Sequence, residues 1–293
     1  MNFKKIELSD KEIFDKYYEK YPQTSAYLSF VSLFTWQVQV NFRFLEIDGD
    51  IVIKYESYKD KKEYYILPET NEEITKKVID ALLEEEKEKV LLSNLTKNQV
   101  DMIKKIYPDK FNFFRTRNSD NYIYDAQEMA TLPGKKFHSK KNFVNRFKKE
   151  YSYTYEKIDD KLKEECLKLL DVWCEKKDCA HGALEAEACA CRLALNNMDK
   201  LSLEGGALRV DGKTVAFTLC EKYNPDMAII HFEKADTEFR GAFQTIFYEF
   251  SNHELSNVKF INREEDMGDE GLRKAKLSYK PCLMLEMYGG NLV

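Results

Sequence analysis

Apolar and polar residues alternate along this chain with two different periods, which separate predicted helices from predicted strands. One long segment shows the helical period clearly, since its apolar positions Leu162, Cys166, Leu169 and Trp173 step by three and four residues. Near the start of the chain, Pro22 separates two such segments. On this basis the predicted helices lie at residues 11–20, 26–36, 71–86, 97–106, 162–173, 184–196, 242–252 and 271–277.

Two β-hairpins are predicted where Asp-Gly dipeptides interrupt strand-like runs. Asp48-Gly49 lies within residues 42–55, and Asp211-Gly212 follows the run at residues 203–210. This dipeptide tolerates the positive φ angles of a type I′ turn, which joins adjacent antiparallel strands. Further strands are predicted at residues 64–67, 89–92, 153–158, 214–220, 227–232, 258–261 and 283–288, and around Phe111 and Tyr122.

The order of elements in the first half of the chain returns in the second half. The turn residues Gly49 and Gly212 are 163 positions apart, and Ile66 and Ile230, in the following predicted strands, are 164 apart. A repeat at near-constant offset indicates two copies of one domain. We therefore predict an α+β fold with one domain at residues 1–134, a linker helix at residues 135–150, and a second domain at residues 151–293 that carries the site.

Composition narrows the classes of partner. The 293 residues include 46 Lys and Arg against 51 Asp and Glu, a formal net charge of −5, so any anionic partner must use a local patch. The first residues lack the apolar centre of a signal peptide, and no run approaches the roughly 20 apolar residues of a membrane span. We expect a cytoplasmic protein with no transmembrane segment.

The seven cysteines form no disulfide framework, which favours free thiols. A cluster of potential zinc ligands comprises Cys174, Cys179, His181, Cys189 and Cys191. Because Cys189 and Cys191 are two positions apart on a predicted helix, they point to different faces. We predict small buried side chains here and no metal site.

A basic stretch joins the two predicted domains. It has no acidic residue before Glu150, and phenylalanines interleave with its cations at roughly helical spacing. A phosphate-rich partner and a solvated linker both agree with this pattern. The cations of the stretch are Lys135, Lys136, Lys140, Lys141, Arg146, Lys148 and Lys149.

The densest group of candidate catalytic side chains follows the predicted strand at residues 258–261. The loop there runs Asn262, Arg263, Glu264, Glu265, Asp266, and sites of α/β proteins form where strands end. Glu233 and Asp236 similarly follow the buried strand at residues 227–232. Ion pairs between neighbours are the alternative interpretation, and His231 within that strand is predicted to be a core histidine.

Three segments carry a resemblance to a known family: residues 231–244, residues 262–276 and the basic residues 140–149. Together they resemble the soluble catalytic domain of phosphatidylglycerol lysyltransferases, over residues 24–288. The resemblance implies tandem GNAT domains like those of the Fem peptidyltransferases, and aminoacyl transfer from a charged tRNA without a further cofactor. It implies that the loop and helix start at residues 239–244 hold the donor, and that Tyr279 is the acid.

The candidate site residues fall into three groups. The catalytic candidates are Glu233, Asp236, Asp266 and Tyr279; the substrate-binding candidates are Arg240, Gly241, Gln244, Asn262, Arg263 and Glu264; the tRNA- or phosphate-binding candidates are Lys140, Lys141 and Arg146. The acceptor, a small molecule or a lipid headgroup, is not assigned. A CoA-dependent N-acyltransferase and a non-catalytic amino-acid or nucleic-acid binding module are the alternatives.

Overall fold

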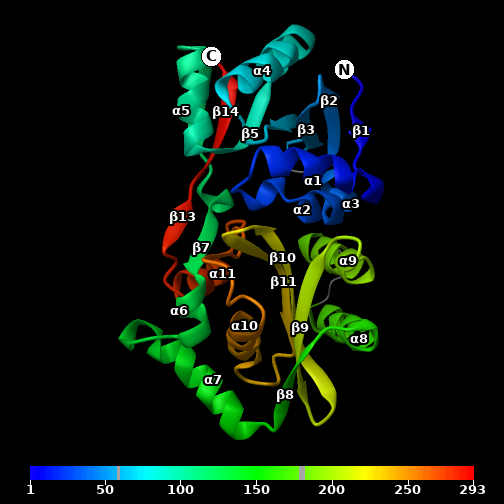
Figure 1. Ribbon diagram of the computed structural model, residues 1–293, viewed down its shortest axis with the longest axis vertical. Helices are drawn as coiled ribbons and strands as arrows, with labels where there is room; N and C mark the ends of the chain where they lie inside the picture. Colours follow the sequence, from blue (N-terminus) through cyan, green and yellow to red (C-terminus); the bar gives the residue numbers. More distant parts are fainter. Residues whose placement is uncertain (58–59, 178–181) are drawn as a thin grey trace. The chain divides into compact units, whose positions relative to one another are not determined.

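The computed structural model describes residues 1–57, 60–177 and 182–293, which form two compact units. Unit 1 comprises residues 1–121, 265–268 and 284–293. Unit 2 comprises residues 122–264 and 269–283. Within the described residues, each unit holds one mixed seven-stranded sheet that carries helices (Figure 1).

The sheet of unit 1 has the strand order β1-β2-β3-β4-β5-β14-β6. Val52 and Leu92 of this sheet pack with Ile79 and Ile103 in one buried cluster, so the apolar stripes of helices α4 and α5 cover the sheet. The strands are β1 (Lys4–Lys5), β2 (Arg43–Ile47), β3 (Asp50–Glu56), β4 (Glu63–Ile66), β5 (Leu91–Thr96), β6 (Phe111–Arg115) and β14 (Met287–Leu292). The helices are α1 (Lys11–Lys20), α2 (Phe30–Thr35), α3 (Gln37–Val40), α4 (Glu72–Glu86) and α5 (Lys97–Ile106).

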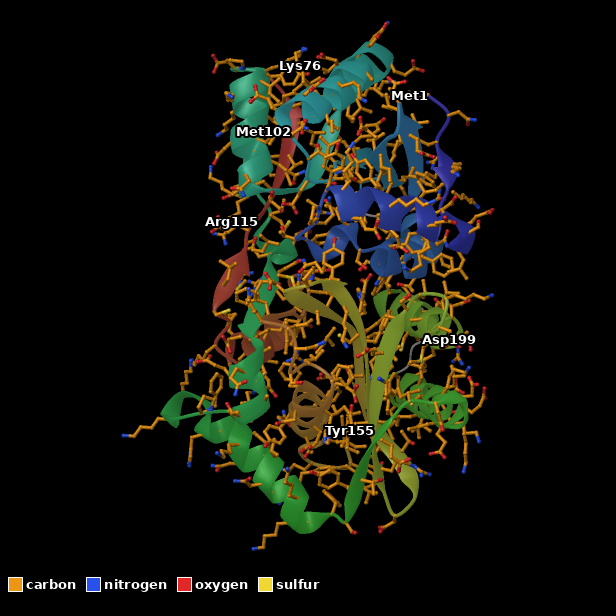
Figure 2. All side chains as sticks on the ribbon, in the orientation of Figure 1. Met1, Lys76, Met102, Arg115, Tyr155 and Asp199 are labelled. Atoms are coloured by element: carbon orange, nitrogen blue, oxygen red, sulfur yellow. The ribbon has the colours of Figure 1, made fainter. Side chains whose placement is uncertain are left out.

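The sheet of unit 2 has the order β13-β7-β12-β11-β10-β9-β8, with helices α8 and α9 on one side and α10 on the other (Figure 1). Tyr155, labelled in Figure 2, stacks on His253 with ring centroids 4.5 Å apart and so joins β8 to α10. The strands are β7 (Asn121–Asp125), β8 (Tyr153–Lys157), β9 (Leu203–Val210), β10 (Lys213–Asn224), β11 (Met227–Ala235), β12 (Phe260–Asn262) and β13 (Leu283–Leu285). The helices are α6 (Ala126–Thr131), α7 (His138–Glu150), α8 (Asp160–Lys177), α9 (Ala183–Asn196), α10 (Ala242–His253) and α11 (Glu270–Leu277).

The two sheets repeat one strand order, and each takes one strand from the other half of the sequence. In unit 1 the C-terminal strand β14 lies between β5 and β6, and in unit 2 strand β7 lies between β12 and β13. Each sheet also contains one parallel pair at the equivalent place, β4 with β5 and β11 with β12. This recurrence confirms the predicted α+β fold with two copies of one domain.

Because each sheet takes one strand from the other half of the sequence, the two units do not begin and end at the predicted domain boundaries, residues 134 and 151. The basic helix α7 lies within unit 2, whereas β14 pairs with strands of unit 1. The predicted single strand at residues 283–288 is two strands in two sheets. Periodicity shows which residues form strands, but it does not show which strands pair.

Local signals were reliable where they rest on turn and cap chemistry. The hairpin residues Asp48 and Gly49 have φ of 50° and 83°, and Asp211 and Gly212 have φ of 49° and 79°, as a type I′ turn requires. The predicted helix at residues 26–36 is interrupted, however. Ser29 has an extended backbone and its side chain accepts a hydrogen bond from the N–H of Ser32, so a new helix begins there.

Candidate active site

The candidate site forms where two neighbouring strands of unit 2 part. Strand β11 pairs in parallel with β12 over Met227–Ile229 and Phe260–Asn262, and β11 then continues to Ala235. Glu233 lies in this continuation, and Arg263 directly follows β12. Arg263 Nη2 donates a hydrogen bond to Glu233 Oε1 over 3.0 Å. The ion pair therefore joins the ends of two strands that no longer pair with each other.

Aromatic rings surround the guanidinium of Arg263. Its centre lies 4.1 Å from the ring of Phe247 on α10 and 5.3 Å from the ring of Tyr279, which follows α11. The rings of Phe247 and Tyr279 pack edge to face, and Tyr124 of β7 packs against both. These rings restrict the access of water, which strengthens the electrostatic interactions of the pair.

Two lysines add positive charge near the Glu233–Arg263 pair. Lys276 on α11 donates from Nζ to the backbone carbonyl of Arg263 over 2.5 Å, and the Tyr124 hydroxyl donates to the carbonyl of Lys276 over 2.8 Å. Lys140 on α7 places Nζ 4.3 Å from the centre of the Tyr279 ring. Burial, and to a smaller degree the charge of Arg263, lowers the pKa of Lys140.

The carboxylate of Glu233 has one oxygen available to a ligand. Its Oε2 is buried and has no hydrogen-bond partner in the described part of the chain, while Oε1 is bound by Arg263. Burial raises the pKa of Glu233, although Arg263 and the lysines Lys276 and Lys234 oppose the rise. An unsatisfied buried oxygen on a carboxylate with a raised pKa suits a group that receives a proton or binds an ammonium ion.

Tyr279 supplies a hydroxyl that stays protonated. Burial raises the pKa of Tyr279, although the charge of Arg263 opposes the rise. A hydroxyl held in the protonated form can donate a proton or a hydrogen bond to a developing alkoxide. The geometry therefore places a potential proton acceptor, Glu233, and a potential proton donor, Tyr279, on the same guanidinium.

A buried histidine fixes the loop that carries Arg263. The ring nitrogens of His231 contact Glu264 over 2.8 Å and Glu221 over 3.1 Å. Burial lowers the pKa of His231, but the two carboxylates outweigh it and raise the pKa to about 9. The Glu264 N–H also binds Asn262 Oδ1 over 2.8 Å. His231 is thus the satisfied core histidine that was predicted, and Glu264 and Asn262 bind within the chain.

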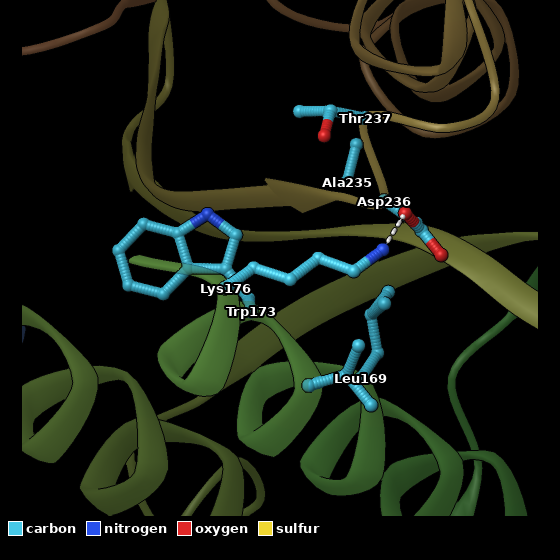
Figure 3. A pocket seen from close by; sticks show the side chains of 7 residues that line it. Leu169, Trp173, Lys176, Ala235, Asp236 and Thr237 are labelled. Atoms are coloured by element: carbon cyan, nitrogen blue, oxygen red, sulfur yellow. Dashed lines mark hydrogen bonds and ion pairs between the residues drawn. The ribbon is translucent and has the colours of Figure 1, made fainter. Parts of the chain in front are cut away.

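Asp236 lies apart from the group of side chains described so far. This group, the Glu233 cluster, consists of Glu233, Arg263, Tyr279, Phe247, Tyr124, Lys276 and Lys140. Lys176 Nζ lies 2.9 Å from its Oδ1 and Lys213 Nζ lies 3.8 Å from its Oδ2. Figure 3 shows this Lys176–Asp236 pair at a pocket on the α8 side of β11, with Trp173 as one wall. The predicted substrate-binding residue Arg240 has a different neighbour as well. The centre of its guanidinium lies 5.9 Å from the centre of the Phe143 ring.

The remaining predicted residues have contacts of their own. Asp266 belongs to unit 1, where its Oδ2 lies 3.3 Å from Arg117 Nη1. Gly241 has φ of 96°, and a Cβ there would lie 2.9 Å from the carbonyl oxygen of Phe143, so this glycine allows α10 to approach α7. Gln244, in the first turn of α10, is half-buried.

The basic helix α7 divides its cations between two environments. Lys141 and Arg146 are exposed, and Arg146 forms an ion pair with Glu150 over 2.6 Å. Lys140, by contrast, is only 9% exposed and faces Tyr279. The sequence grouped these three residues as one phosphate-binding set, whereas the structure directs Lys140 inward.

Three members of the cluster were missed by the sequence analysis: Lys276, Phe247 and Tyr124. Lys276 had a usable signal, because it lies only three residues before the candidate Tyr279. Phe247 and Tyr124 had none, since an aromatic residue in an apolar helix or strand predicts core packing.

No metal centre is evident within the described residues. None of their His, Cys, Asp and Glu side chains gather in groups of three or more that could hold a metal ion. Cys179 and His181, two of the potential zinc ligands, lie outside the described residues. Burial raises the pKa of the Cys191 thiol to about 12, in agreement with the predicted small buried side chain.

Comparison with models of known protein families places this site in a family. Residues 18–288 match the model described as phosphatidylglycerol lysyltransferase, C-terminal. The chain belongs to this family. The matched segment includes every residue of the Glu233 cluster. The cluster therefore lies in the part of the chain that is similar to the phosphatidylglycerol lysyltransferase C-terminal family.

Several solved structures are similar to this chain in fold. A conserved protein of unknown function from Bacteroides thetaiotaomicron VPI-5482 is 36% identical, with a TM-score of 0.91 and coverage of 100% of both chains. L-PGS from Bacillus licheniformis is 15% identical with a TM-score of 0.66, covering 96% of this chain and 91% of that one. FemX is 10% identical with a TM-score of 0.62, covering 100% and 98%. The last two similarities confirm the predicted fold.

A curated relative matches a smaller part of the chain. An uncharacterized protein of Mycoplasmoides gallisepticum is 27% identical over 178 residues, which are 58% of this chain and 56% of that protein. The match thus spans little more than half of that relative's length. Among the described helices, none combines the length and apolar character needed to cross a membrane.

Proposed function

We propose that the chain is an aminoacyltransferase that moves an aminoacyl group from aminoacyl-tRNA to an acceptor with an amine or hydroxyl nucleophile. The observation that carries the proposal is the buried Glu233–Arg263 pair, with its unpartnered carboxylate oxygen, in a member of a lysyltransferase family. In this proposal Glu233 is the proton acceptor that acyl transfer needs.

The cluster suggests a role for each group in this transfer. The acceptor attacks the ester carbonyl and loses its proton to Glu233, whose raised pKa brings it closer to neutral pH. The bond from the carbonyl carbon to the ribose oxygen then breaks. Tyr279 gives that oxygen its proton, and Arg263 stabilises the negative charge that develops on the carbonyl oxygen.

The donor would approach along the exposed cations of α7. Lys141 and Arg146 face solvent there, where phosphates of a tRNA can reach them. Replacing both with alanine is expected to weaken tRNA binding and to flatten its dependence on salt by up to ~0.9 per lost duplex phosphate contact. Unchanged affinity and slope would leave α7 as a solvated helix.

The test of the function is the transfer itself. A mixture of tRNAs charged with labelled amino acids is incubated with the chain and a cell extract, and label that leaves tRNA for another molecule is measured. Glu233→Gln is expected to slow transfer by roughly 10²–10⁴-fold. The matched control is Glu238→Gln, because Glu238 is a nearby carboxylate whose side chain is 73% exposed. Equal rates for Glu233→Gln and wild type would contradict the proposal.

A further inference from the structure

Lys140 is a buried cation for which the described residues provide no counter-ion. It is 9% exposed, and in the described part of the chain its ammonium forms no ion pair or hydrogen bond. Its contact is with the face of the Tyr279 ring. The other lysines on α7 differ, since Lys148 pairs with Glu249 over 2.8 Å, and Lys141 and Lys149 are exposed to solvent. A buried charge without a partner is unfavourable, so such a group marks a site where a ligand supplies the missing charge.

The charges around Lys140 have the same sign. The Tyr279 ring lies 4.3 Å from Lys140 Nζ and 5.3 Å from the centre of the Arg263 guanidinium. Lys276 in turn donates a hydrogen bond to the backbone carbonyl of Arg263. The carboxylate of Glu233 binds Arg263, while the neighbouring Glu264 binds His231 instead. The cluster therefore has an excess of positive charge in a place with little water.

Arg263 also retains hydrogen-bonding capacity. Within the described residues, its guanidinium binds Glu233 through Nη2 alone, which leaves Nε and Nη1 as donors. A guanidinium fork beside an ammonium matches the three-dimensional spread of phosphate oxygens better than the two oxygens of a carboxylate.

We propose that Lys140 and Arg263, which both contact the ring of the proton donor Tyr279, bind a phosphate group of a substrate. The ligand class is a phosphate mono- or diester whose adjoining part reaches Glu233. As a statement about a substrate, this inference rests on the proposed function. The phosphate belongs either to the 3′ end of the tRNA or to the headgroup of a phosphate-bearing acceptor.

The first experiment measures acylation of individual lysines by mass spectrometry. The full chain is treated with an amine-acylating reagent at constant ionic strength, with inorganic phosphate or with chloride alone. Phosphate is expected to slow acylation of Lys140 and to leave that of Lys161, an exposed lysine on α8, unchanged. Equal acylation of Lys140 in the two salts overturns the inference.

Variants make the result specific to Lys140. Lys140→Ala is expected to weaken phosphate binding by at least about 10-fold, the loss of a hydrogen bond between charged groups, while Lys161→Ala on the exposed face of α8 leaves it unchanged. Lys140→Arg keeps the charge and is expected to restore binding, which separates loss of charge from loss of folding. A Lys140→Ala variant that folds and binds phosphate like wild type overturns the inference.

Two further ligands identify the source of the phosphate. The trinucleotide CCA represents the tRNA end, and glycerophosphoglycerol represents a phosphatidylglycerol headgroup. Protection of Lys140 by one of them assigns the source, and protection by neither overturns the substrate assignment. Because protection is measured without turnover, it can succeed where labelled transfer fails, and a failure of the proposed function is thereby distinguished from a failure of this inference.

Discussion

Arg263 donates a hydrogen bond to Glu233 over 3.0 Å, and in doing so it joins the ends of β11 and β12 beyond their last paired residues. The side chains of the two residues are 14% and 11% exposed. A buried ion pair adds little to the stability of the fold, because the cost of removing both charges from water offsets much of their attraction. Its presence therefore favours a functional role. Removing one partner is costly because the other then stays buried and charged.

We predict that Arg263→Ala destabilises the fold by about 3–5 kcal/mol, since it leaves Glu233 buried without its cation. The double variant Glu233→Gln with Arg263→Met is expected to lose less, because neither charge remains. Urea denaturation measures both. A double variant less stable than Arg263→Ala would contradict this explanation.

His231 predicts a pH dependence of stability. Its pKa rises from 6.5 to about 9 in the folded chain, so folding favours the protonated ring. The associated stability, about 3 kcal/mol, is fully present below pH 6.5 and is lost as pH rises through about 9. Denaturant unfolding at a series of pH values should show this decline in wild type and a flatter profile in His231→Gln. Identical profiles would show that another group is responsible.

Gly241 is predicted to be essential for packing α10 on α7. Gly241→Ala adds a Cβ 2.9 Å from a backbone oxygen at φ of 96°, and we expect a loss of roughly 1–3 kcal/mol. Gly212→Ala is the matched control, since its φ is 79° but no atom lies within 4 Å of the added Cβ. Thermal unfolding should show the larger loss for Gly241→Ala. Equal losses would assign the cost to backbone strain alone.

Acetyl-CoA is expected to bind weakly, with a Kd no better than about 1 mM, or roughly −4 kcal/mol. A CoA diphosphate needs small residues where it approaches backbone N–H groups, and the start of α10 has Phe243 instead. Phe243 packs against the buried cluster that contains Phe147, so it does not simply turn away. Calorimetric titration tests this prediction. Micromolar binding with one site per chain would favour the CoA-dependent acyltransferase.

The sequence predicted local elements well, because their signals are local. The helix at residues 11–20 was predicted with the observed ends, and both Asp-Gly hairpins are present. The exchange of β7 and β14 was missed, because strand pairing depends on contacts between residues far apart in the sequence. The short helix α6 was also missed.

The candidate site was predicted in part for the same reason. Glu233 lies in β11 beyond its pairing with β12, Arg263 directly follows β12, and the parallel pairing of the two strands brings the residues together. Asp236 also follows β11, but it binds Lys176 on the α8 side. The burial of Lys140 depends on how α7 packs, and the basic sequence of that helix suggested exposure.

The most direct test offers the chain both donors at once. Aminoacyl-tRNA carries one isotope in its aminoacyl group, acetyl-CoA carries a second isotope in its acetyl group, and a cell extract supplies the acceptor. We predict that the aminoacyl label alone moves to the acceptor and that Glu233→Gln stops this movement. Transfer of the acetyl label, with the aminoacyl label left on tRNA, would contradict it.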